Sequence, residues 1–145
     1  MLKKDAYTST QVLRALGLSY RQLVWWDSQG YVSPSGRAGR PGSGLWRRYS
    51  LRDVAALEAA RRLREMGVPL PQARRALALL RDSLPVPTPE GAVLLADGRG
   101  RALIAADPAE IAAFILRSDA AVCLPVGRII REAERALEDA RRKSS

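Results

Sequence analysis

The sequence predicts a mainly α-helical protein with a small amount of β structure, divided in two by a proline-rich segment. Apolar residues recur at helical spacing over most of residues 1–83, with hydroxyl or proline residues where the helices begin. Glycine and proline interrupt this pattern between Tyr31 and Trp46. Residues 84–90 form a stiff linker, and residues 91–145 predict a small α+β module, a β-hairpin plus two helices.

The first two helices are short and close together. Thr8-Ser9-Thr10 offers N-cap hydroxyls to a helix that Gly17 ends. Ser19 caps a second helix that stops at Gly30, and in it Leu23 and Trp26 lie three residues apart, so both can face inward. Two such helices joined by a short glycine-containing turn form the helix-turn-helix pattern.

Residues 31–46 predict a wing, because a glycine-rich loop lies there between two stretches that favour short strands. A third helix follows Ser50, with Asp53 at the fourth position of a capping box, and Gly67 ends it. A fourth helix begins at Pro71, a residue favoured in the first turn, and runs to about Ser83.

The elements expected after the linker are also marked by turn and cap residues. Asp97-Gly98 between the apolar runs 92–96 and 101–105 predicts the hairpin. Asp107-Pro108 opens a helix through residue 117, residues 122–124 could form a third short strand, and the last helix begins near Gly127.

Charge is distributed unevenly along the chain. Residues 1–75 contain 14 Lys and Arg against five Asp and Glu, which accounts for the whole net charge of +9, while residues 76–145 contain ten of each. A basic composition common to the whole chain would have spread the excess evenly. The asymmetry therefore indicates a polyanion, and nucleic acid above all, as the partner of the first half.

Several classes of protein are not expected. The chain has no His and one Cys, Cys123, so an internal disulfide, a sensor with clustered Cys or His, and an axial His for haem or a corrinoid are excluded, and we expect no cofactor. Cys123 lies between Val122 and Leu124, which favours a buried, inert thiol. Neither a signal peptide nor a span of ~18 apolar residues is present, so a cytoplasmic location is expected. No catalytic constellation indicates an enzyme.

The first half resembles the MerR family of transcription regulators. The resemblance rests on Tyr7-Thr8, Leu16-Gly17-Leu18-Ser19, Arg21-Gln22-Leu23, Trp25-Trp26-Asp27, Ser33-Pro34, Arg47-Arg48-Tyr49-Ser50, Asp53-Val54 and Leu63-Arg64-Glu65-Met66-Gly67-Val68-Pro69-Leu70, in order and spacing over residues 6–80. It implies a winged helix-turn-helix domain that binds double-stranded DNA.

The resemblance also implies which residues meet DNA. Ser19, Tyr20 and Arg21 fall at the start of the recognition helix that enters the major groove, where Arg can contact guanine. Arg47 and Tyr49 match the pair in the wing that binds phosphates, and Arg64 matches a cation near the operator centre. Trp26 is expected in the core, whereas Trp25 is a candidate for contact with DNA. The complete expected set is Thr8, Ser19, Tyr20, Arg21, Trp25, Arg37, Arg40, Arg47, Arg48, Tyr49 and Arg64.

Two features depart from the family pattern. Val24 stands where an Arg is usual, which removes one phosphate contact. The long helix through which family members dimerise is reduced here to residues 71–83, which is too short for much of a coiled coil. The last helix offers an apolar stripe for a dimer contact instead, through Ile129, Ile130, Ala133 and Leu137. Its alternative use is to cover the hairpin of its own chain.

The leading hypothesis is a homodimer that binds an inverted repeat in promoter DNA and distorts it, which realigns the elements that RNA polymerase recognises. One rival is an effector-free architectural or excisionase-like DNA-binding protein. The other is an antitoxin-like or polymerase-contacting role, in which the tail binds a protein partner.

Overall fold

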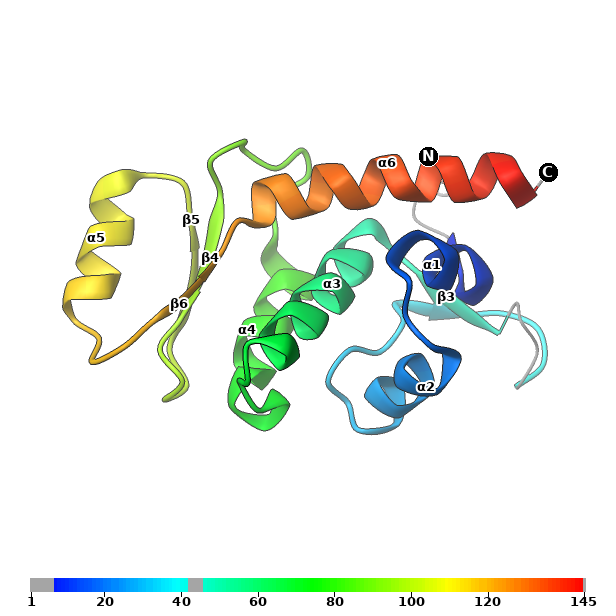
Figure 1. Ribbon diagram of the computed structural model, residues 1–145, viewed down its shortest axis with the longest axis horizontal. Helices are drawn as coiled ribbons and strands as arrows, with labels where there is room; N and C mark the ends of the chain where they lie inside the picture. The colour runs from blue at the N-terminus through cyan, green and yellow to red at the C-terminus, as the bar shows by residue number, and fades with distance from the viewer. Residues whose placement is uncertain (1–6, 42–45, 145) are drawn as a thin grey trace.

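The computed structural model describes residues 7–41 and 46–144, and in these residues the chain forms six helices and six short strands (Figure 1). In order they are β1 (Tyr7–Thr8), α1 (Ser9–Leu16), α2 (Tyr20–Ser28), β2 (Gly36–Arg37), β3 (Arg47–Tyr49), α3 (Leu51–Glu65), α4 (Leu70–Ser83), β4 (Val93–Ala96), β5 (Ala102–Ala105), α5 (Pro108–Leu116), β6 (Val122–Leu124) and α6 (Val126–Ser144). The mainly α fold with a small α+β module is thus confirmed.

The first three helices begin at hydroxyl residues that the sequence marks as N-caps. The Thr8, Ser19 and Ser50 side chains each accept a hydrogen bond from the backbone N–H three residues later, at 3.3, 3.1 and 3.1 Å. In return, each third residue binds the backbone of its cap, which completes three capping boxes. Because Ser19 starts α2, the residues at the front of that helix are fixed by local chemistry alone.

The first sheet connects the helix-turn-helix to the wing. Its strand order is β1-β3-β2, with Tyr7 opposite Tyr49 and Arg37 opposite Arg47, both pairs antiparallel. The wing has two strands, as predicted, but β2 lies within the glycine-rich stretch expected to be a loop and β3 begins just after residue 46. β1 has only two residues and was not predicted from the sequence. The tip of the predicted wing, residues 42–45, lies outside the described residues.

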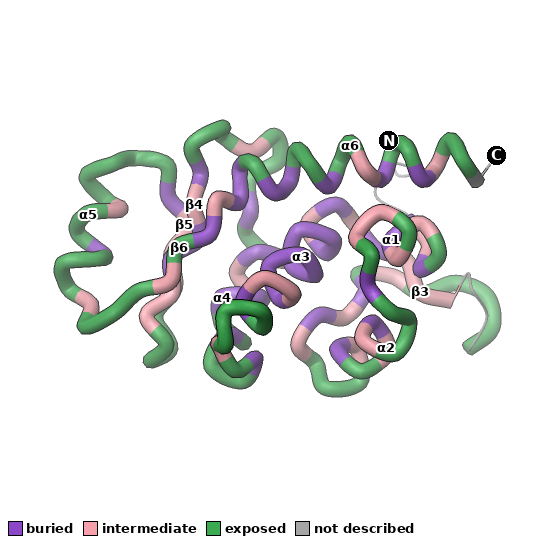
Figure 2. Tube along the Cα trace, in the orientation of Figure 1, coloured by how far each residue is buried: buried purple, intermediate pink, exposed green. Residues whose placement is uncertain are grey.

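Helix α3 forms the centre of the molecule, and Figure 2 shows it buried along most of its length. Ten of its 15 residues are buried, which an Ala-rich helix permits because small side chains let neighbouring helices approach on several sides. α4 packs on one side of α3, and α6 packs across both α3 and α1 (Figure 1).

The packing of α6 corrects one prediction. Ile129, Ile130, Ala133 and Leu137 are at most 4% exposed, because they face α1 and α3 of their own chain. They are therefore not available in this structure as the dimer contact expected of them. Covering the hairpin, their alternative role, is a minor one, since α6 contacts β4 much less than it contacts α1 and α3.

The second sheet, of order β5-β4-β6, separates α5 from the rest of the molecule. Leu94, Ile104 and Leu124 lie in one row and face the core shared with α4. The next row places Leu95 and Cys123 on the opposite face, where Phe114 of α5 packs. Cys123 lies on the outer strand β6 and is exposed, so its predicted burial is wrong.

The proline-rich linker does not divide the hydrophobic core. Buried residues from both sides of it, such as Leu80 and Leu94, belong to one cluster. At the far end of the linker, a Cβ on Gly127 would lie 2.5 Å from the carbonyl oxygens of Pro89 and Glu90, so only glycine lets α6 begin there. Among residues 7–41 and 46–144, no helix combines the length and apolar character needed to cross a bilayer.

Candidate nucleic-acid interface

An acidic side chain in α2 joins the recognition helix to the wing. Arg37 donates two hydrogen bonds to Asp27, at 3.0 and 2.9 Å, and Arg47 Nε donates a third, at 2.8 Å. Arg47 also donates to the Tyr20 hydroxyl at 3.3 Å. The side chains of Asp27 and Arg47 are only 8% and 12% exposed, so the pair is shielded from solvent. These contacts hold α2, β2 and β3 in one fixed arrangement.

The Asp27 carboxylate remains charged within this cluster. Partial burial works to raise its pKa, but the hydrogen bonds from Arg37 and Arg47 outweigh burial, and the resulting pKa is below the ordinary value. One carboxylate therefore offsets part of the charge of two arginines. The wing keeps a net positive charge, and Asp27 reduces the repulsion between the neighbouring guanidinium groups of Arg37 and Arg47.

Four of the predicted DNA contacts are exposed at the start and along the outer face of α2. They are Ser19, Tyr20, Arg21 and Trp25, of which Tyr20 is 45% and Trp25 54% exposed. Trp26, the neighbour of Trp25, is 1% exposed and packs in the core as predicted. The side chain of Arg21 makes no hydrogen bond or ion pair with any residue in the described part of the chain, so its guanidinium group is available to a ligand.

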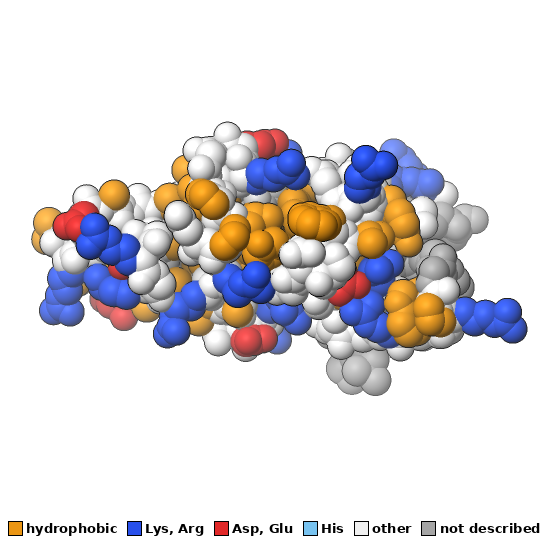
Figure 3. All heavy atoms as spheres, turned by 90° about the horizontal axis from the view of Figure 1, so that it is seen from below, with side chains coloured by type: hydrophobic (Ala, Val, Ile, Leu, Met, Phe, Trp, Pro, Cys, Tyr) orange, Lys and Arg blue, Asp and Glu red, His pale blue; other side chains and the backbone are white. Residues whose placement is uncertain are grey.

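Arg64 extends the exposed face from α2 to the end of α3. A hollow of about 510 Å³ lies between these helices and the start of α4, with Arg21, Trp25, Arg64 and Pro69 among the residues in its wall. The side chain of Arg64 is exposed and, like that of Arg21, has no hydrogen-bonding or ionic partner among the described residues. Figure 3 shows this side of the molecule, where blue Lys and Arg side chains alternate with orange hydrophobic ones.

The other predicted contacts in the wing differ in their exposure. Arg40 is exposed, beside Gly39 with φ +80°, while Arg37 is partly covered by its pairing with Asp27 and lies 5.6 Å from the centre of the Trp46 ring. Arg48 is half-buried. Thr8 is also half-buried, and its hydroxyl oxygen accepts the cap hydrogen bond of α1.

Tyr49 does not lie where the sequence placed it. Its side chain is fully buried in the core next to β1, so it cannot reach a phosphate in this arrangement. The hydroxyl has no hydrogen-bond partner among the described residues, and burial raises its pKa well above the ordinary value for tyrosine. Strand alternation places the predicted pair, Arg47 and Tyr49, on the same face of β3, and this face turns inward: Tyr49 enters the core and Arg47 binds Asp27.

Two organising residues were missed by sequence reasoning. Asp27 is one, and its signal was present, because it is one of only five acids in the basic first half. Arg74 of α4 is the other: it donates to the carbonyl oxygen of Gln29 at 3.2 Å and lies 4.5 Å from the centre of the Tyr31 ring. Arg74 thus attaches α4 to the end of α2, a contact that no local sequence pattern indicates.

Comparison with known proteins agrees with this geometry. Residues 7–80 match the model of the MerR HTH family of regulatory proteins, which covers β1 to α4. Similar proteins include uncharacterized HTH-type transcriptional regulators of Mycobacterium bovis and Mycobacterium tuberculosis, each 36% identical over 75 residues. The alignment covers 52% of this chain and 33% of each relative. The aligned part of the chain thus corresponds to about a third of the length of these relatives. Because the family model matches more than half of the residues, the chain belongs to the MerR family of helix-turn-helix regulatory proteins.

Proposed function

We propose that this protein is a sequence-specific transcription regulator that binds promoter DNA as a homodimer and distorts it. The observation that carries the proposal is the exposed, unpaired Arg21 at the start of α2, on a helix that Asp27 fixes to a basic wing. The front of the recognition helix is where a helix-turn-helix protein contacts base edges, and a bidentate Arg is the commonest side chain that reads guanine.

The residues around Arg21 support a division of roles. Trp25 and Arg64 lie on the same hollow, at the side of α2, where they can contact the sugar-phosphate backbone rather than base edges. Arg40 in the wing is exposed, and we expect it to contact a neighbouring groove. Contacts that flank the major-groove helix on two sides favour a protein that bends or untwists DNA, because a curved duplex meets more of them. Such a change in promoter geometry would act on RNA polymerase.

The test begins with selection of duplex DNA from a random pool and measurement of affinity at several salt concentrations. For Arg21→Ala we expect an affinity loss of about 1–3 kcal/mol and a weaker preference for the selected site over unrelated DNA. The matched control is Arg135→Ala, which removes one exposed positive charge from α6, on the side of the molecule away from α2 (Figure 1). Equal losses from the two variants would contradict the assignment of Arg21.

The proposed distortion has its own measurement. Fluorophores at the two ends of the selected duplex would change their transfer efficiency when protein binds, if the duplex is bent. The contradicting result is a sequence-specific complex in which the distance between the duplex ends and the twist of the duplex are the same as in free DNA. That result would rule out the distortion mechanism and leave DNA recognition intact. Cooperative filling of direct repeats in place of one palindromic site would instead favour the architectural alternative.

A further inference from the structure

Helix α5 presents an apolar face that no other described residue of its own chain covers. Leu116 is 84% and Ile115 45% exposed, and they are adjacent. Pro108, Ala109, Ala112 and Ala113 on the same helix are exposed as well, and Glu110 is its one charged residue. Only Phe114 is buried, against the sheet. Single exposed apolar residues are ordinary, but a contiguous group of them marks an interaction surface.

We infer that this face, defined by Ala109, Ala112, Ile115 and Leu116, is the contact between two copies of the chain, related by a two-fold axis that runs along α5. The inference rests on the homodimer of the proposed function and assigns its location. The α5 face takes the place of the apolar stripe of α6 as the dimer contact, because Ile129 and Leu137 of that stripe are already buried against α1 and α3. In the described helices, the apolar side of α4 is likewise buried, by α3 and the second sheet.

Charge supports a second copy as the occupant. When a two-fold axis runs along a helix, each residue of the contact face meets the same residue of the partner, so a charge there would meet its like. On α5 the positions 109, 112 and 116 recur at spacings of three and four, and all are apolar. Glu110 and Arg117, which are seven residues apart, fall to one side of this stripe. A face with no charge suits self-association better than binding to DNA or to a charged protein.

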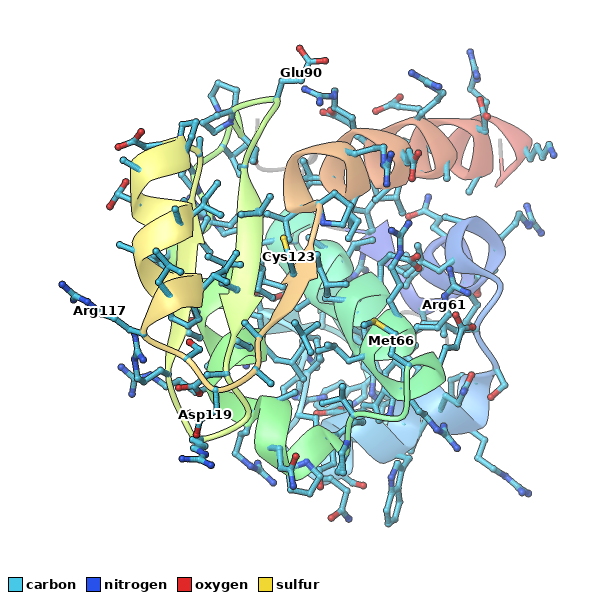
Figure 4. The ribbon with its side chains drawn as sticks, turned by 60° about the vertical axis from the view of Figure 1, so that its left-hand side comes forward. Arg61, Met66, Glu90, Arg117, Asp119 and Cys123 are labelled. Atoms are coloured by element: carbon cyan, nitrogen blue, oxygen red, sulfur yellow. The ribbon has the colours of Figure 1, made fainter. Side chains whose placement is uncertain are left out.

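The direction of α5 fits simultaneous binding of both subunits to one duplex. In Figures 1 and 4, α5 runs from the upper side of the molecule to the lower side, where α2 and the start of α4 lie. A two-fold axis along α5 therefore leaves both recognition helices on the same side. Figure 4 shows the Arg117 side chain pointing outward at the lower end of the helix, clear of the sheet. The basic halves of the two subunits lie away from the contact, so their like charges remain apart.

The experiment measures self-association of the whole chain by sedimentation equilibrium. Leu116→Glu and Leu116→Lys are each expected to weaken the dimer on the order of a hundredfold, because two like charges then meet in a contact that has lost two leucines. A 1:1 mixture of the two variants is expected to recover association, since position 116 of one copy meets position 116 of the other. Val86→Glu, at a 49% exposed apolar residue of the linker, is the control and should leave the dimer intact.

Each outcome separates the inference from the proposed function. A wild-type dimer that both Leu116 variants leave unchanged would overturn the α5 contact but keep the homodimer. Weakened variants that do not recover on mixing would overturn the arrangement along α5. A wild-type chain that stays monomeric both free and on its selected DNA would overturn the homodimer itself. Because Leu116 is almost fully exposed, the variants should melt at the wild-type temperature.

Discussion

The two ends of this molecule differ in how their exposed residues are held. At the end that we propose meets DNA, Tyr20, Arg37 and Arg47 are fixed by hydrogen bonds that converge on α2. Arg21, whose side chain has no partner among the described residues, lies on the same helix. At the other end, α5 is attached through Phe114 and carries apolar residues that remain uncovered by residues 7–41 and 46–144. Charged side chains that are to meet a nucleic acid need hydrogen bonds and ion pairs that fix their positions, whereas an apolar contact needs only a rigid helix.

The largest expected difference concerns two leucines, one in α6 and one in α5. Leu137→Ala should lower the free energy of unfolding by about 2–5 kcal/mol, because it opens a cavity between α6 and the first helices. Leu116→Ala should change the stability of the monomer by no more than about 0.5 kcal/mol, because its side chain touches mostly solvent. Denaturant titration at a concentration where the chain is monomeric measures both values. Similar losses would mean that α5 is not the outer surface described.

The next effect separates base recognition from phosphate binding. Arg64→Ala should weaken binding about equally for selected and unrelated duplexes, by about 1 kcal/mol, and lower the salt slope by about 1. Arg21→Ala should reduce the preference for the selected site instead. Affinities measured for both duplexes at three salt concentrations provide the comparison. A larger loss of sequence preference for Arg64→Ala than for Arg21→Ala would reverse the two assignments.

Asp27→Asn tests whether the wing must be held in place. Simple electrostatics predicts tighter DNA binding because a negative charge is lost, but we expect weaker binding, by about 1 kcal/mol, since Arg37 and Arg47 lose their common partner. Gel-shift titration distinguishes the two signs. Asn is close in size to Asp, so the packing of α2 is kept.

The same variant should also alter the acid sensitivity of the fold. The pKa of Asp27 in the folded protein is lowered below that of an unfolded chain, which is about 3.9. Its ion pairs therefore stabilise the fold above that value, and this stability is lost as the pH falls through the lowered pKa. Urea unfolding between about pH 5 and pH 2 should consequently show a smaller decline for Asp27→Asn than for the wild type. A parallel decline would contradict the role of the carboxylate.

The smallest effect is expected at Tyr49. Tyr49→Phe removes a buried hydroxyl that has no partner among the described residues, so stability should stay the same or rise by up to about 1 kcal/mol. DNA affinity should be unchanged, in contrast to the phosphate contact that the sequence suggested. Thermal melting and DNA titration of one preparation would settle both points.

The sequence predicts best what local chemistry determines. Ser19 and Ser50 fix where their helices start, and Asp107 with Pro108 fixes the start of α5, because caps act within one turn. It predicts less well what depends on the approach of distant segments. Arg37 and Arg47 meet Asp27 from 10 and 20 residues away, and the two-residue strand β1 exists only because β3 lies beside it.

Exposure was the property most often mistaken from sequence. Cys123 has two apolar neighbours, but strand alternation turns it to the face opposite Leu124, on a strand with no neighbour beyond it in the described sheet. Ile129 and Leu137 form a correct amphipathic stripe, but the stripe itself does not reveal whether its own chain or another covers it. Strand register decides the exposure of Cys123, and the packing partner of α6 decides the exposure of Ile129 and Leu137.

DNA binding and self-association can be measured together in one experiment. Sedimentation velocity with a fluorescent duplex carrying the selected site would report both for Arg21→Ala and Leu116→Glu. We expect Arg21→Ala to form the wild-type dimer but to bind the duplex more weakly, by about 1–3 kcal/mol. We expect Leu116→Glu to be a monomer that still binds the recognition half-site, with lower affinity for the full site. If Arg21→Ala lost the dimer, or if Leu116→Glu lost all contact with the half-site, the separation of the two ends would be contradicted.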